Sequence, residues 1–268
     1  MITVAYLITY PIKACRGHEV DASNVERVGL ECDRRMMVVT PEGLFLTQRE
    51  YPKLALVTPS IAGEELTLFA PGTDGLRTLI RVSGPTCAVD IWHSKGVQAV
   101  DQGEEAAEWF SDWLGAPVRL VHIAEGYQRR VDEQYAVNAD DHTGFADGYP
   151  ILLASEESLA DLNTRLDEPI PMNRFRPNLV VRGCEPFAED TWSRVRIGEI
   201  EMAVVKPCAR CVVTTIDKET LVKSKEPLKT LASYRARDGE AMFGQNVIPL
   251  SEGRLRLGMN VEILSKRE

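Results

Sequence analysis

The chain has 268 residues and a formal net charge of −9, with 44% hydrophobic and 26% charged residues. These values are ordinary for a soluble globular protein, and they exclude a disordered chain, a collagen and a coiled coil. The acidic balance argues against partners such as nucleic acid or an anionic membrane surface. No apolar run of 18 residues and no typical signal peptide is present, so we expect a cytoplasmic protein without a membrane segment.

Short β-type runs separated by Gly, Pro and Asp clusters dominate the first 100 residues. A strand at the N-terminus is followed by a predicted hairpin that pairs residues 36–40 with 44–47 across Pro41-Glu42-Gly43. A helix is predicted over 103–114, because acids fill its first turn and Gly115 follows it. Further strands are predicted at 54–59, 65–69, 76–82, 88–92 and 118–123.

A polar, irregular stretch at 125–148 is predicted to be a linker or a site loop. We divide the chain here into domains of residues 1–122 and 123–268. In the second domain, Ser155 is the predicted N-cap of a helix that runs to about Leu166, and a second helix is predicted over 226–237. The remaining strands are predicted at 178–182, 194–197, 200–205, 211–216, 246–249 and 254–264. The fold class is therefore β-rich (α+β), with a barrel or sandwich favoured over alternating βαβ units.

The sharpest local feature is the cysteine pair Cys208 and Cys211, whose spacing suits several chemistries. Zinc would need further ligands, and the four histidines are scattered. Thiol–disulfide exchange normally places the pair at the start of a helix, whereas a β-type segment follows here. A single thiolate could hold a soft transition metal, with Lys206 and Arg210 favouring the ionised form. Two buried cysteines that pack as small hydrophobic side chains remain the simplest alternative.

Basic residues recur at the predicted strand ends, among them Lys13, Arg34, Arg35, Arg174 and Arg176. Arginine side chains bind phosphate and carboxylate groups through two parallel hydrogen bonds. These residues would form an anion site if the fold brought them together, and otherwise they are exposed residues with surface salt bridges. No P-loop, dinucleotide-binding, zinc-protease or serine-hydrolase motif is present.

Seven segments together resemble one known family. They are YPIKACRG (10–17), GLECDRRMMVV (29–39), FADGYPILLASEESLADL (145–162), NRFRPNLVVRGC (173–184), KPCARCVVTTID (206–217), EPLKTLASYR (226–235) and FGQN (243–246). The chain is similar to MOSC-domain proteins of the bacterial YcbX type and to the mitochondrial amidoxime-reducing components. The resemblance implies an N-terminal β-barrel domain followed by a MOSC β-barrel domain with a few helices, with the cofactor between them.

The resemblance also implies a molybdenum cofactor, in which the metal is carried by a pyranopterin dithiolene. Cys211 matches the single protein ligand of the metal. Basic positions that hold the cofactor's phosphate and pterin are matched by Lys13, Arg34 and Arg176, and adjoining contact positions by Ala209 and Arg210. Asp147 and Asn178 match polar positions near the metal, and Asp147 is a candidate for proton transfer. Ala14 stands where the family often has serine, so that hydroxyl contact is missing.

The implied activity is reduction of N-hydroxylated compounds such as amidoximes, hydroxylamines and N-hydroxylated base analogues, which would serve detoxification. Some bacterial relatives carry a C-terminal plant-type ferredoxin domain, whose C-x4-C-x2-C spacing is absent from this chain. Electrons would therefore come from a separate protein of the ferredoxin, flavoprotein or cytochrome type, or from such a domain that this sequence does not include. Two alternatives stay open: a sulfur or cofactor carrier with a persulfide on Cys208 or Cys211, and a non-catalytic interaction module with structural cysteines.

Overall fold

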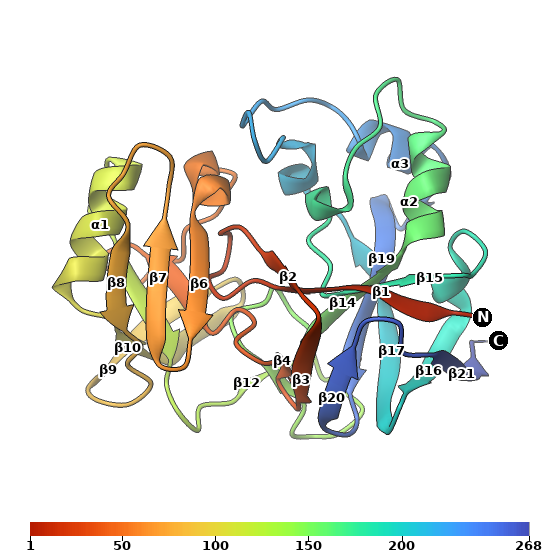
Figure 1. Ribbon diagram of the computed structural model, residues 1–268, viewed down its shortest axis with the longest axis horizontal. Helices are drawn as coiled ribbons and strands as arrows, with labels where there is room; N and C mark the ends of the chain where they lie inside the picture. Colours follow the sequence, from red (N-terminus) through yellow and green to blue (C-terminus); the bar gives the residue numbers. More distant parts are fainter. Residues whose placement is uncertain (268) are drawn as a thin grey trace.

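The computed structural model describes residues 1–267, which form two β-rich bodies lying side by side (Figure 1). The N-terminal body consists of residues 36–123. The C-terminal body consists of residues 1–30 and 151–267, so the first strands of the chain belong to it. The predicted division at residues 122 and 123 thus separates strands that lie in one sheet, and as a domain boundary it stays a prediction.

One nine-stranded sheet forms most of the C-terminal body. The first strand, β1, pairs antiparallel with β15, for example Leu7 with Leu179, and β14 and β15 are parallel. The strand order is β2 (His18–Val20), β1 (Thr3–Thr9), β15 (Leu179–Arg182), β14 (Ile151–Ser155), β19 (Glu240–Pro249), β17 (Ile200–Ala209), β16 (Trp192–Ile197), β21 (Val261–Lys266), with β18 (Ala236–Arg237) paired to β19.

Two smaller sheets and one helix form the N-terminal body. The first sheet has the order β5 (Met36–Val39), β11 (Arg119–Ile123), β10 (Ser94–Asp101), β9 (Thr86–Ile91). The second has the order β6 (Thr58–Ala62), β7 (Glu65–Phe69), β8 (Leu76–Leu79). Phe110 of helix α1 (Glu104–Leu114) is fully buried against Leu66 and Leu120 of these sheets.

Short strands complete the two bodies and the segment between them. The sheet β20 (Gly253–Arg256), β3 (Ala22–Glu26), β4 (Gly29–Leu30) again joins an early segment to a late one. The pair β12 (Arg129–Arg130) and β13 (His142–Thr143) lies within the irregular stretch 125–148. No helix within residues 1–267 is long and apolar enough to cross a membrane.

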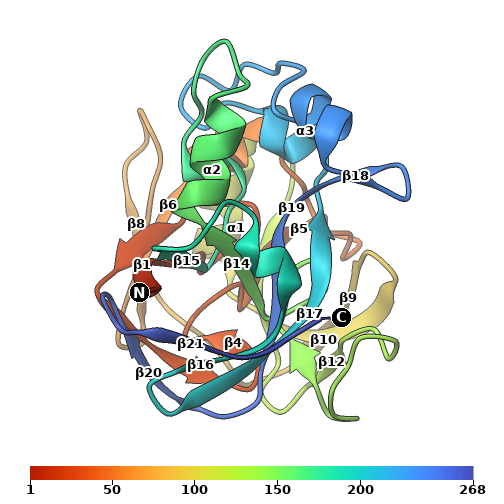
Figure 2. The same ribbon diagram turned by 90° about the vertical axis from the view of Figure 1, so that its right-hand side faces the viewer.

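The three predicted α-helices are present within the described chain. Helix α1 ends where Gly115 adopts a left-handed conformation and its N–H bonds to the Ser111 carbonyl. Helices α2 (Glu156–Asn163) and α3 (Leu228–Tyr234) lie on one side of the large sheet (Figure 2), over a core that includes Leu162, Phe175, Leu231 and Phe243. Helix α2 is shorter than predicted, because the Asn163 side chain bonds to both backbone groups of Ile170 and turns the chain.

Three strand predictions were wrong. The single strand predicted over 254–264 is divided into β20 and β21, which lie in different sheets. Residues 52–56, predicted in part as strand, form the 3₁₀ helix η1 (Pro52–Leu56), with proline in its first turn. Residues 212–215 form η4 (Val212–Thr215) in place of a strand over 211–216. The Thr214 and Thr215 hydroxyls donate to the carbonyls of Cys211 and Val212 at 2.9 and 2.8 Å. These local bonds stabilise a tight turn against the β preference of the threonines.

The predicted N-cap Ser155 is part of a fully buried polar cluster at the start of α2. Its hydroxyl accepts from the Ser158 N–H at 3.1 Å and donates to the Glu189 carboxylate at 3.1 Å. Ser158 Oγ donates to the other Glu189 oxygen at 2.7 Å. Glu189 has no solvent exposure, and burial raises its pKa, although the two hydroxyls oppose this. The cluster therefore joins α2 to η3 (Ala188–Thr191) around a carboxyl group that is costly to ionise.

We expect Glu189→Gln to be more stable than the wild type at neutral pH. The amide oxygen can accept from one hydroxyl and the amide nitrogen can donate to the other, and the side chain has no charge to bury. A carboxyl group whose pKa is higher in the folded than in the unfolded state loses stability as pH rises through its unfolded pKa. Chemical unfolding should show the advantage of the variant growing by up to about 1.4 kcal/mol per pH unit above the ordinary glutamate range. A constant difference across pH, as expected for the exposed Glu252→Gln control, would contradict this account.

Candidate functional site

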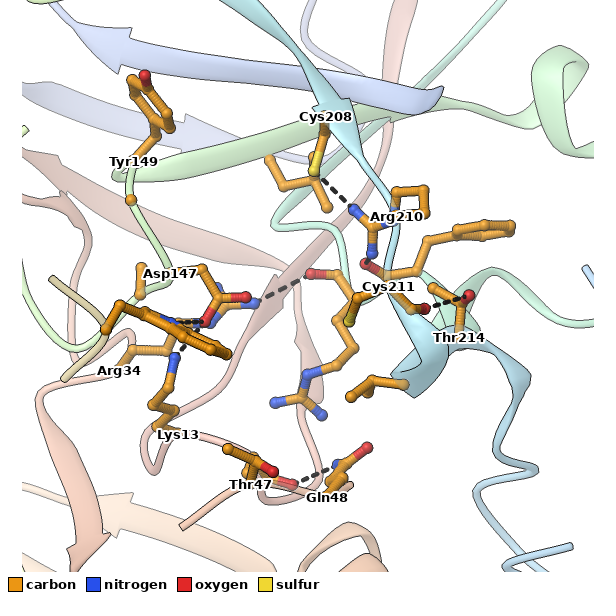
Figure 3. A pocket seen from close by; sticks show the side chains of 18 of the residues that line it. Lys13, Arg34, Thr47, Gln48, Asp147, Tyr149, Cys208, Arg210, Cys211 and Thr214 are labelled. Atoms are coloured by element: carbon orange, nitrogen blue, oxygen red, sulfur yellow. Dashed lines mark hydrogen bonds and ion pairs between the residues drawn. The ribbon is translucent and has the colours of Figure 1, made fainter. Parts of the chain in front are cut away.

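A cleft at the junction of the two bodies brings together most of the predicted site residues. It encloses about 910 Å³, including space open to solvent. In Figure 3, Lys13, Arg34 and Asp147 face Cys211 across it. Ala209 alone of the predicted set does not line the cleft, whereas Ala14 does, with a methyl group where the family often has a hydroxyl. The predicted residues that line it are Lys13, Arg34, Asp147, Arg176, Asn178, Arg210 and Cys211.

The cleft is strongly cationic although the chain is acidic overall. Its lining includes six arginine or lysine side chains and a single carboxylate, Asp147, against a net charge of −9 for the whole chain. Clefts lined by one sign of charge concentrate ligands of the opposite sign. The cations are Lys13, Arg34, Arg49, Arg174, Arg176 and Arg210.

Asp147 comes from the end of the irregular stretch 125–148, predicted to be a linker or a site loop, and it brings that stretch into the cleft lining. Its Oδ1 accepts from Lys13 Nζ and from Trp92 Nε1, the latter at 3.0 Å, while 76% of the side chain remains open to the cleft. Its deep position would raise the pKa, but Lys13, Trp92 and Arg34 together hold the pKa of Asp147 well below its usual range. The ionised form suits orientation and electrostatic work better than proton donation at neutral pH.

Arg34 is fixed by three acceptors. It donates to Asp33 at 2.7 Å, to Asn178 Oδ1 at 2.9 Å and to the Arg176 carbonyl at 3.1 Å. The Asn178 amide also bonds to Leu152 N–H and to the Ile8 carbonyl, both at 3.2 Å. The Asn178 side chain therefore bonds to Arg34 and to two strands of the sheet, and these bonds position Arg34.

Arg176 differs from Arg34 because its guanidinium has no acceptor within residues 1–267. Both guanidiniums lie 4.3 Å from the ring centroid of Tyr10, and both residues have a left-handed backbone. The Nη2 atom of Arg176 is buried without a hydrogen bond, and burial lowers the pKa of the side chain. A buried polar group without a partner is unusual and calls for a ligand or other explanation.

Strand β17 presents the cysteine pair. Arg210 N–H bonds to the Ala241 carbonyl at 2.8 Å, and its guanidinium donates to the Phe175 carbonyl at 2.6 Å and to Cys208 Sγ at 2.9 Å. Cys211 follows as the residue that caps η4, and its thiol faces the cleft. Lys206, predicted to favour a thiolate, instead lies over the Tyr135 ring at 4.5 Å. Arg210 is thus the cation that contacts the pair.

Sequence reasoning missed two residues, Arg129 and Lys218, that hold the site in place. The buried Arg129 donates to the carbonyls of Gly144, Ala146 and Asp147 and so shapes the loop that carries Asp147. The buried Lys218 donates to Gln48 Oε1 at 2.8 Å and to the Val213 carbonyl at 2.9 Å, which ties η4 to the N-terminal body. Such residues are distant in sequence from their partners, and no spacing marks them.

Lys218 is also a buried charge among other charges. Burial, together with Arg176 and Arg174, lowers its pKa to about 7, although Cys211 opposes this. Burial first, and the neighbouring arginines second, therefore make the protonated form of Lys218 costly.

Within residues 1–267, no group of three or more His, Cys, Asp or Glu side chains is arranged to hold a metal ion. Cys211 lies in the cleft outside any such group, although Cys208 and Asp147 also line it. A metal at Cys211 would therefore need its remaining donors from a bound organic ligand.

Comparisons with known proteins show the family of the chain. The chain matches the family described as "MOSC N-terminal beta barrel domain" over residues 1–117 and the "MOSC domain" over residues 140–262. It is 37% identical to mitochondrial amidoxime-reducing component 1 of Homo sapiens, over 98% of this chain and 83% of that protein. It is 38% identical to component 2 of Bos taurus, over 88% of this chain and 73% of that protein. Component 1 of Danio rerio is also 38% identical, over 95% and 82% of the two chains.

The fold class and the family predicted from the sequence are both confirmed. The matched family regions meet at the cleft, since Lys13 and Arg34 lie in the first and Arg176 and Cys211 in the second. The chain belongs to the MOSC-domain family that includes the mitochondrial amidoxime-reducing components.

Proposed function

We propose that this chain is a molybdenum-cofactor-dependent reductase of N-hydroxylated compounds. The observation that carries the proposal is one cationic cleft in which the Cys211 thiol and the unpartnered Arg176 guanidinium both lie. The names of the relatives support the substrate class, since they are described as reducing amidoximes. Amidoximes, hydroxylamines and N-hydroxylated base analogues are the proposed substrates.

The residues present fit this cofactor in three respects. Its phosphate needs cationic donors, and Arg176 has a buried nitrogen without a partner. Its metal brings sulfur donors of its own, and Cys211 provides a lone soft ligand. Its pterin would be held by polar and cationic side chains that line the cleft at the junction of both bodies. We therefore assign Cys211 as the metal ligand, with Lys13, Arg34, Arg176 and Arg210 as cofactor-binding residues. The assignment of Ala209 rests on the family resemblance alone, because this residue does not line the cleft.

When bound, the cofactor supplies two-electron chemistry that, with two protons, converts an N–OH group to N–H and water. The protein's part is binding and orientation. Asn178 and Asp33 hold the Arg34 guanidinium, and Lys218 holds the turn that carries Cys211. The ionised Asp147 keeps Lys13 and the Trp92 indole in place. It is the one carboxylate of the cleft lining that could accept a hydrogen bond from a substrate N–H or O–H group. We propose a separate electron-transfer protein of the ferredoxin, flavoprotein or cytochrome type as the donor.

The test is expression in cells with an intact cofactor pathway, followed by molybdenum and pterin analysis and an assay with benzamidoxime and reduced methyl viologen. We expect near-stoichiometric molybdenum and pterin, together with benzamidine formation that depends on both. Folded protein that carries no molybdenum and no pterin would overturn the proposal.

A second candidate function is sulfur transfer through a cysteine persulfide. The observation in its favour is the hydrogen bond from Arg210 to Cys208 Sγ, because a guanidinium stabilises a sulfur anion. A carrier would take labelled sulfane sulfur from a persulfide donor, which leaves as a thiol, onto the Cys208 thiolate, and it would lose that capacity in Cys208→Ala. A reductase would keep its amidoxime activity in the same variant.

A further inference from the structure

Arg49 lies in the lining of the cleft on the side of the N-terminal body. The residue is exposed, and its guanidinium lies 5.0 Å from the ring centroid of Trp92. Within residues 1–267 this guanidinium makes neither a hydrogen bond nor an ion pair. Its position is nevertheless defined, because its backbone N–H bonds to Thr47 Oγ1 at 3.1 Å and its side chain rests on the indole.

Trp92 is a fixed platform for this cation. Its Nε1 donates to Asp147 at 3.0 Å, and its ring packs edge-on against Phe45 with centroids 4.7 Å apart. Lys13 Nζ lies 5.9 Å from the same ring. The residue has a φ of 50°, a backbone conformation that is uncommon for a bulky side chain and is found where surrounding contacts enforce it. The Arg49 side chain is therefore held at the cleft by Trp92, which Asp147 and Phe45 fix in turn.

The cleft cations fall into two groups by their partners. Lys13, Arg34 and Arg174 each pair with a carboxylate: Asp147, Asp33 and Asp217, respectively. Arg210 bonds to a backbone carbonyl and to a sulfur. Only Arg49 and Arg176 are left without an acceptor within the described residues.

The two acceptor-free arginines also differ in exposure. Arg176 has a buried nitrogen and suits a group that stays bound, whereas Arg49 is open to solvent and suits a group that arrives and leaves.

We propose that Arg49 binds an anionic oxygen group of the substrate, either a carboxylate or a phosphate, so that the enzyme prefers anionic N-hydroxylated compounds. The inference rests on the proposed reductase function. A guanidinium fork binds both oxyanions through two parallel hydrogen bonds, and the stacked indole reduces the side-chain freedom lost on binding. The single carboxylate of the lining is already engaged by Lys13 and Trp92, so little opposes a negative substrate.

The experiment compares four substrates of one size class on the molybdenum-loaded enzyme. These are benzamidoxime and its para-carboxy, para-phosphono and para-trimethylammonio derivatives. We expect KM to be about five-fold lower for one or both anions than for the neutral compound, a size typical of an exposed ion pair, and highest for the cation. The preference should shrink between 50 mM and 500 mM salt. The carboxy and phosphono arms distinguish the two oxyanions.

Arg49→Gln should bring the ratio of neutral to anionic KM to about one, and Arg49→Lys should restore part of it by keeping the charge. Arg254→Gln is the matched control, because it removes an exposed arginine from β20, outside the cleft lining, with the same change in net charge. That control should keep the wild-type ratio.

A second readout does not need turnover. Calorimetric binding of 4-carboxybenzamide, which has no N–OH group, should weaken in Arg49→Gln and not in Arg254→Gln. Equal KM values for all four substrates and equal binding by both variants would overturn the role of Arg49 and leave the reductase function standing. Absence of benzamidoxime reduction by loaded wild type would instead overturn the reductase function, and the calorimetry would still decide whether Arg49 binds an anion.

Discussion

Cys211→Ala is expected to abolish amidoxime reduction and to lower the molybdenum content of purified protein. Cys211 is the one thiol of the pair that follows β17 and caps η4, and no set of three metal-binding side chains exists within residues 1–267 to replace it. Removing a group that only supports a metal ligand lowers metal affinity or activity by about 10–100-fold. Loss of the ligand itself should exceed about 100-fold in kcat/KM. Metal analysis and a viologen-coupled assay measure the two effects.

Cys208→Ala is the matched control for this prediction, since it removes a thiol three residues away that also lines the cleft. Its sulfur accepts a bond from Arg210, which keeps its second bond to the Phe175 carbonyl. We expect this variant to retain molybdenum and most of its activity. If Cys208→Ala lost the metal and Cys211→Ala kept it, the assignment of the ligand would have to be exchanged.

The β-rich fold could be predicted because short-range signals mark its elements. Gly115 ended α1 as expected, and Ser155 capped α2. The prediction failed at residues 211–216, where side-chain hydroxyls bond to nearby carbonyls and override the β preference of the threonines. The pairing of β1 with β15 could not be predicted either, because the pairing of strands so far apart in the sequence leaves no local sequence pattern.

For the cleft, the family resemblance provided Cys211 and four of the six cations, Lys13, Arg34, Arg176 and Arg210, whereas composition alone left them as scattered residues. Arg49 was not predicted, because no motif marks it. The structure adds how they are held. Asn178 was predicted as a cofactor contact, yet its amide bonds to Arg34 and to the backbones of Leu152 and Ile8. Lys218 was not predicted, because its partner Gln48 lies 170 residues away. Contacts between the two bodies determine these roles, and a linear pattern does not contain them.

Arg176→Met and Arg34→Met are expected to weaken cofactor retention alike but to change the stability of the cofactor-free fold in opposite directions. The two arginines are well matched: each lies 4.3 Å from the Tyr10 ring and each has a left-handed backbone. Arg34 neutralises Asp33, whose side chain is 2% exposed, so its removal leaves a buried charge without its partner. Breaking such a pair costs about 3–5 kcal/mol.

Arg176 neutralises no group of the described chain, and folding without the cofactor removes its guanidinium from water without an acceptor in return. Methionine at this position should leave the free energy of unfolding unchanged or raise it by about 1 kcal/mol, after the loss of the contact with Tyr10. Cofactor retention should nevertheless fall by about 10–100-fold, the value of one or two charge-assisted hydrogen bonds. Urea unfolding of cofactor-free protein and pterin analysis of loaded protein measure the two effects separately. A loss of more than about 2 kcal/mol in Arg176→Met would mean that this guanidinium stabilises the fold itself, and its assignment to a bound anion would then be wrong.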